Sequence, residues 1–89
     1  MKRRKVILSP EALADLKRLH DWIATRAGSA VALAYVGRIE TLCLGFDIGG
    51  ERGTRRDDIR AGLRTVGFER RVTIAFTVTD VHVTVIRIF

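Results

Sequence analysis

A regular alternation of residue types near the C-terminal end most strongly limits the folds open to this chain. Between Val72 and Val78, every second residue is large and apolar and the residues between are threonine or alanine, which is the period of a half-buried strand. After a polar break at Thr79-Asp80, the run Val81–Phe89 is again rich in β-branched residues. The two runs therefore predict a β-hairpin with one buried face.

A third alternating run, Ile59–Val66, precedes this hairpin. One side of the run is mostly apolar, and the other carries Arg60 and Arg64. Alternate residues of a strand point to the same face, so we expect these two arginines to lie together. The irregular stretch Phe68–Arg71 would form the turn to the next strand. Together the three runs predict an antiparallel meander with one basic side.

Two helices are predicted ahead of the meander. Ser9 is a good N-cap, and apolar residues recur at spacings of three and four over Pro10–Arg26, with proline at the first helical position. Gly28 supplies the left-handed residue that a tight turn between helices needs, and Ser29 is expected to cap a second helix over Ala30–Phe46. The two helices should form an antiparallel hairpin.

The short apolar run Lys5–Leu8 predicts one more strand, whose place in the sheet the sequence leaves open. A length of 89 residues suits one core, so residues 1–89 are expected to form a single α+β domain. Its element order would be β-α-α-β-β-β, with a mainly antiparallel four-stranded sheet and the helical hairpin packed on one face. The residues expected in the core are Leu16, Leu19, Ile39, Cys43, Val72, Ile74 and Phe76.

Positive charge is concentrated in two places. The net charge is +6, and 13 of the 16 basic residues are arginine, which favours bidentate contacts with phosphate or carboxylate. Residues 2–5 are all basic, and residues 51–71 carry seven arginines against four acids. This distribution fits an acidic partner, protein or nucleic acid, or a solvated surface that keeps a small domain soluble.

No segment is expected to enter a membrane. A membrane span needs about 18 apolar residues, and no run of that kind is apparent. The basic start is followed by only three apolar residues before Ser9-Pro10, which argues against a signal peptide and favours the cytoplasm. Cys43 falls at a core-facing helical position, so a buried thiol is expected there instead of a nucleophile or a ligand.

The second predicted helix is also apolar on a side other than its core face. Leu33 and Leu44 lie on that side with Gly37, which has no side chain to keep a neighbour away. These residues could line a groove for another apolar helix, or Gly37 could only let the first helix approach closely. Trp22, on the flank of the first helix, either covers the core edge or anchors a partner.

The sequence offers few groups for acid–base chemistry. Tyr35 falls on a helix core face, and His82 alternates onto the side away from Arg87, which leaves Glu69 in a turn. The glycine-rich loop at 47–58 lacks both the strand-to-helix context and the ending of a phosphate-binding loop. Neither a catalytic residue, a metal site nor a cofactor is expected.

Several short motifs occur in an order and spacing that match a known family. They are Leu8-Ser9-Pro10, Ala14-Asp15-Leu16, Gly28, Ile59-Arg60-Ala61-Gly62-Leu63-Arg64 and Val85-Ile86-Arg87-Ile88. With these motifs the chain resembles the ParE branch of the RelE/ParE toxins of bacterial toxin–antitoxin pairs, over essentially its whole length. It departs from the pattern at its end, because such toxins usually continue with a short tail and this sequence stops at Phe89.

The resemblance implies a toxin that a ParD-like antitoxin holds inactive in a hetero-oligomer and that poisons DNA gyrase when released. The antitoxin would supply an acidic, amphipathic helix, and DNA would be contacted only through it, with no membrane partner. Two alternatives stay open. One is a RelE-like ribosome-dependent mRNA endonuclease, and the other is a basic nucleic-acid-binding module that uses residues 2–5 and the arginine face.

We expect toxicity to depend on recognition by arginines and not on acid–base chemistry. Arg87 is the family-like arginine of the closing strand, although it could instead pair with a carboxylate at the rim of the core. The expected target-binding residues are Arg60, Arg64, Arg70, Arg71 and Arg87. The expected antitoxin-binding residues are Trp22, Leu33, Gly37 and Leu44.

Overall fold

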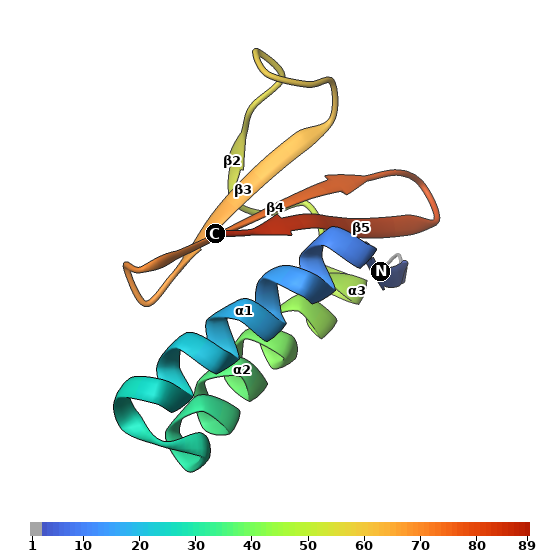
Figure 1. Cartoon of the computed structure of the whole chain (residues 1–89). Coiled ribbons are helices and arrows are strands. Elements are labelled where there is room, and N and C mark those ends of the chain that lie inside the picture. Colours follow the sequence, from blue (N-terminus) through green and yellow to red (C-terminus); the bar gives the residue numbers. More distant parts are fainter. Residues whose placement is uncertain (1–2) are drawn as a thin grey trace.

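The computed structural model describes residues 3–89, so Lys2, part of the basic stretch considered above, lies outside the described residues. The fold is α+β, with a helical hairpin beneath one face of a five-stranded sheet (Figure 1). Its elements are β1 (Lys5–Leu8), α1 (Pro10–Ala27), α2 (Ser29–Leu44), α3 (Phe46–Gly49), β2 (Thr54–Arg55), β3 (Leu63–Phe68), β4 (Val72–Val78) and β5 (His82–Ile88).

The strands are ordered β1-β5-β4-β3-β2 across the sheet. Strands β3, β4 and β5 form the predicted antiparallel meander. Strand β1, whose place the sequence left open, runs parallel to β5, with Lys5 opposite His82 and Leu8 opposite Val85. The predicted count of four strands is one too low, because β2 also pairs with β3. Two residues are too few to show an alternation, so the sequence carries no signal for β2.

Strand β3 begins at Leu63, four residues later than predicted. Asp57 Oδ1 accepts a hydrogen bond of 2.9 Å from the backbone N–H of Gly62, whose φ of 77° turns the chain. Ile59 is therefore in a turn and is 64% exposed. Arg60 lies in the same turn, so it does not belong to one alternating strand with Arg64 as predicted.

The helices agree with prediction to within two residues. The Ser9 side chain accepts a hydrogen bond of 3.0 Å from the backbone N–H of the third residue of α1, which satisfies one of the free donors at the helix start. Gly28 takes the expected positive φ, at 95°. The expected cap at Ser29 is wrong, because Ser29 is the first residue of α2 and no side chain caps that helix. Phe46 belongs to the separate short helix α3.

The core lies between the helices and the facing side of the sheet. Six of the seven residues expected there are buried, and only Leu19 is half-buried. Phe46 stacks on Phe76 of β4 with ring centroids 4.5 Å apart. Cys43 is fully buried, and this burial raises the pKa of its thiol to about 11, so the thiol is protonated at neutral pH as expected of a structural cysteine.

The helical segment Ser29–Gly49 contradicts one expectation. By length and composition alone it is apolar enough to cross a membrane, so the prediction that no such run exists was wrong. The core helix of a soluble protein meets the same test. In this structure, Ala32, Ile39 and Cys43 of α2 are fully buried in the core.

Candidate functional site

An apolar groove lies between the helical hairpin and the turn that joins β3 to β4. Its volume is about 530 Å³, and it is lined by Leu19, Trp22 and Ile23 of α1, Tyr35 of α2, and Arg71 and Val72. The helical spacing of the α1 residues brings all three to one side of the helix. The Trp22 side chain is 54% exposed, so much of a large apolar ring remains uncovered. We call this feature the Trp22 groove.

Arginines surround the Trp22 groove. The Arg26 guanidinium lies 4.0 Å from the centroid of the Trp22 ring, a cation–π contact worth about 0.5–1 kcal/mol at an exposed site. The Arg38 guanidinium lies 5.1 Å from the Tyr35 ring centroid and also donates hydrogen bonds of 3.1–3.3 Å to both carboxylate oxygens of Glu69. The groove thus combines an apolar floor with a cationic rim, which suits an apolar segment carrying acidic side chains.

The four residues predicted to bind an antitoxin do not line one groove. Trp22 lies in the Trp22 groove, whereas Leu33, Gly37 and Leu44 are absent from its lining. Leu33 and Leu44 are more than 60% exposed on α2. A Cβ built on Gly37 would meet no atom within 4 Å. Gly37 therefore does not serve to let another helix approach within the chain, and the second reading of this glycine is wrong.

The face of the sheet away from the helices is uncovered, and we call it the open sheet face. Alternation places Thr73 and Ala75 of β4 there, because Val72, Ile74 and Phe76 are buried on the helix side. A hollow of about 610 Å³ lies on this face. Its lining combines arginines, large apolar residues and small side chains. The lining residues are Arg56, Ile59, Arg60, Leu63, Thr65, Thr73, Ala75, Ile86, Arg87 and Phe89.

A β-bulge brings Arg87 to the open sheet face. Arg87 is opposite Ala75, but Val85 is opposite Phe76, so Ile86 is an extra residue in β5. The sequence alternation had placed Arg87 on the same side as Val85 and away from His82. Both assignments were wrong, because the extra residue shifts the alternation by one beyond Val85. Thr84, opposite Thr77, shares the open sheet face with Arg87.

Arg87 is held by a buried carboxylate. Asp15 of α1 is only 6% exposed and accepts hydrogen bonds from Arg87 Nε at 2.8 Å, Arg87 Nη2 at 3.0 Å and the backbone N–H of Ile88 at 2.9 Å. Arg18 also contacts Asp15 Oδ1. The hydrogen bonds from Arg87, followed by that from Ile88, hold the pKa of Asp15 below its ordinary value despite burial. The alternative for Arg87, pairing with a carboxylate at the core rim, is confirmed.

The pairing of Asp15 with Arg87 was not predicted from the sequence, where Asp15 had only its place in a family motif. The signal for its role was present, since an acid occupies a core-facing helical position between Ala12 and Leu16. A buried carboxylate needs a cationic or hydrogen-bonding partner. The sequence did not show which arginine would be the partner of Asp15.

The five arginines predicted to bind the target are spread over separate surfaces. Arg60 and Arg87 line the open sheet face, and Arg60 has no side-chain hydrogen bond or ion pair within the described residues. Arg64 is opposite Phe76, so it lies on the helix side of the sheet. Arg71 lines the Trp22 groove, while Arg70 is an exposed turn residue with a positive φ of 62°.

Glu69 and Tyr35, two of the groups considered for acid–base chemistry, have side-chain partners in the structure. Glu69 is paired with Arg38, and the Tyr35 ring packs edge-on against Phe68 with centroids 5.5 Å apart. His82 is half-buried in β5, at the end of that strand remote from Arg87. Over residues 3–89, histidine, cysteine and acidic side chains form no cluster that could hold a metal ion.

Comparison with known proteins identifies a family and a shared fold. The family model described as the ParE toxin of the type II toxin–antitoxin system, parDE, matches residues 6–89. Among solved structures, the chain is similar to one described as the chromosomal ParDE TA system from P. aeruginosa, with a TM-score of 0.83 and 24% sequence identity. That match covers 97% of this chain and 94% of the other, and at this identity it shows a shared fold. No curated protein matches the chain by sequence.

Proposed function

This chain belongs to the ParE toxin family of type II toxin–antitoxin systems, and we propose that it inhibits DNA gyrase when released from a ParD-like antitoxin. In this proposal the toxin is stored in the cytoplasm as a hetero-oligomer with the antitoxin, and free toxin arrests growth. Any contact with DNA is made through the antitoxin. A ParD-like partner is supported by the family match and by the similarity to a ParDE system.

We propose that the antitoxin docks an amphipathic, acidic helix in the Trp22 groove. Helix-in-groove recognition requires an apolar trough, which Leu19, Ile23 and Val72 provide around the half-exposed Trp22 ring. Acidic side chains of the helix would face Arg71 at the groove and Arg26 on the Trp22 ring. Aromatic and arginine side chains are those that most often dominate the energy of such interfaces.

The target is proposed to bind at the open sheet face. The observation that carries this proposal is the placement of Arg60 and Arg87 in one hollow, whose lining also includes Ile59 and Phe89. Ile59 and Phe89 are 64% and 68% exposed, so apolar contact area is available beside the cations. Arg60 makes no side-chain ion pair or hydrogen bond among the described residues, so its guanidinium can bind a partner without breaking one.

The test compares Arg60→Gln with Arg64→Gln, which changes charge equally but lies on the helix side of the sheet. Arg60→Gln should weaken gyrase inhibition in a supercoiling assay at least about tenfold, the effect of about 1.4 kcal/mol of lost binding. It should also abolish growth arrest on induction, whereas Arg64→Gln should stay close to the original protein. Equal loss in both variants would contradict recognition at the open sheet face.

A parallel assay separates gyrase inhibition from RNA cleavage. Purified toxin is added to translating ribosomes, and the messenger RNA is examined for cuts. The proposal expects intact RNA and inhibited gyrase, with Glu69→Ala and His82→Ala as active as the original chain. Cut RNA together with unaffected gyrase would make the RelE-like activity correct instead.

A further inference from the structure

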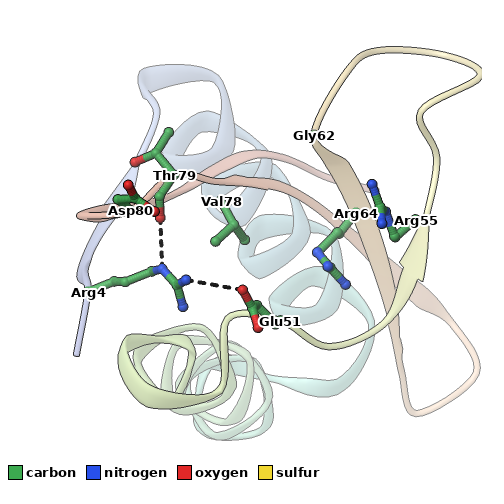
Figure 2. Close-up of a pocket in the computed structure, with 8 residues that line it drawn as sticks. All are labelled: Arg4, Glu51, Arg55, Gly62, Arg64, Val78, Thr79 and Asp80. Carbon is green, nitrogen blue, oxygen red and sulfur yellow. Dashed lines mark hydrogen bonds and ion pairs between the residues drawn. The ribbon is translucent and has the colours of Figure 1, made fainter. Parts of the chain in front are cut away.

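A second arginine cluster surrounds a pocket on the other side of the sheet from the open sheet face. The pocket has a volume of about 250 Å³ and lies among the start of the chain, the loop after α3, β3 and the β4–β5 turn (Figure 2). We call it the arginine pocket. Its charged lining residues are Arg4, Arg55, Arg64, Glu51 and Asp80.

Arg4 is fixed at one wall of the arginine pocket. Its side chain is only 8% exposed, and its Nε donates a hydrogen bond of 2.7 Å to the backbone oxygen of Thr79. The Arg4 backbone N–H donates a hydrogen bond of 2.7 Å to the backbone oxygen of Asp47, so the main chain is held as well. A buried guanidinium held in this way is a strong donor for an anion, since it loses little side-chain freedom on binding.

The present partner of Arg4 inside the pocket is Glu51, and the contact is weak. Arg4 Nη2 lies 3.3 Å from Glu51 Oε1, and the Glu51 side chain is 69% exposed. A negative group that takes the place of Glu51 keeps the buried Arg4 guanidinium paired, so the exchange leaves no uncompensated buried charge. The backbone before Glu51 is closely packed, because a Cβ at Gly50 would lie 2.9 Å from a Val83 methyl group and 3.7 Å from Arg4 Nη1. A negative group can therefore replace Glu51 at Arg4 with little loss.

Arg64 faces the same space from the opposite wall. Figure 2 shows the Arg64 and Arg4 guanidiniums on either side of Glu51, with Asp80 beside Thr79 on the side away from Arg64. The one hydrogen bond of the Arg64 side chain among residues 3–89 runs to the Arg52 oxygen at a long 3.4 Å. Arg64 thus retains donors for a ligand that reaches the centre of the pocket.

We propose that the arginine pocket binds a phosphate group, which displaces Glu51 and is held between Arg4 and Arg64. Phosphate matches the planar donor pair of a guanidinium and can accept from two arginines at once. Arg55 also lines the pocket, but its guanidinium is already paired with Asp57 at 3.1 Å. The phosphate belongs either to a small ester or to a nucleic-acid backbone. This site is separate from the surfaces proposed for gyrase and for the antitoxin.

The test is calorimetric titration of the whole chain with inorganic phosphate at constant ionic strength in chloride. Arg64→Gln should weaken binding at least about tenfold, and Glu51→Gln should strengthen it severalfold because the competing carboxylate is lost. Arg60→Gln, which removes an equal charge from the open sheet face, should bind as the original protein does. These variants leave the buried Arg4 intact and so avoid its structural contacts.

Two results would overturn the proposal. One is equal weakening by Arg64→Gln and Arg60→Gln, which would mean unspecific attraction to a basic protein. The other is Glu51→Gln binding no tighter than the original chain. If phosphate binds as proposed, a 5′-mononucleotide and a short oligonucleotide are titrated next. Tighter binding of the oligonucleotide, lost in Arg64→Gln, assigns a nucleic-acid backbone, and tighter binding of the mononucleotide assigns a small phosphate ester.

Discussion

At the scale of single residues, Asp15 links the first helix to the last strand. Asp15→Asn should lower the free energy of unfolding by about 2–3 kcal/mol at pH 7, because it removes the charge that accepts from Arg87 and Ile88. Loss of a partner in a fully buried pair costs about 3–5 kcal/mol. A smaller value is expected here, since the Arg87 side chain is 48% exposed and remains solvated. Urea denaturation measures the difference.

The same residue predicts a pH dependence. The pKa of Asp15 is lowered in the folded chain, so its stabilisation is present above the unfolded pKa of about 3.9 and is lost as pH falls through the folded value. The stability difference between the original chain and Asp15→Asn should therefore be full at pH 7 and shrink below about pH 4. Asp21 and Asp58 also have lowered pKa values but occur in both proteins, so their effects cancel. A difference that stays constant down to pH 2.5 would contradict this assignment.

Residue positions were predictable only where alternation was unbroken. Val72, Ile74 and Phe76 lie where the period of two places them. Arg87 does not, because one extra residue at Ile86 reverses the faces beyond it, and a bulge leaves no mark in the residue pattern. The predicted placement of Arg60 beside Arg64 is wrong for a related reason. The alternating pattern begins at Ile59, but the residues before Leu63 form a turn.

At the scale of elements, α2 contains a glycine, Gly37, with open space where a side chain would lie. Gly37→Ala should raise the free energy of unfolding by about 0.8–1 kcal/mol, because alanine favours the helix and its Cβ meets no atom within 4 Å. Gly50→Ala is the contrasting variant, with a Cβ 2.9 Å from Val83 and 3.1 Å from the Phe46 oxygen, and it should destabilise the chain. Thermal unfolding of the two variants measures both changes in stability. A lower stability of Gly37→Ala would show that the fold needs glycine at this position.

Elements with local signals were predicted well, and elements that depend on distant contacts were not. The start of α1 is marked by Ser9 and Pro10 at adjacent positions, and its end by Gly28. Strand β2 exists only because Thr54 and Arg55 meet β3 across a loop, which no window of sequence records. The parallel pairing of β1 with β5 likewise joins residues far apart in the sequence, such as Lys5 and His82.

At the scale of the whole molecule, the fold separates the three surfaces at which binding is proposed. The Trp22 groove, the open sheet face and the arginine pocket share no lining residue. The sequence indicated basic and apolar surface, but it placed Arg60 and Arg64 on one strand face, and the structure places them on opposite sides of the sheet. Variants at one surface should consequently act independently of variants at another.

This separation predicts which apolar residues bind the antitoxin. Trp22→Ala should weaken the complex with the cognate antitoxin by about 2 kcal/mol, or roughly 30-fold, as expected for a central aromatic contact. Leu33→Glu places a charge on a side chain that is 64% exposed and outside the Trp22 groove, so it should change affinity less than about threefold. Calorimetric titration of antitoxin into each folded toxin variant measures both effects. If Leu33→Glu weakens binding more than Trp22→Ala, the antitoxin lies instead along Leu33, Gly37 and Leu44 of α2, since these residues follow one another at helical spacing.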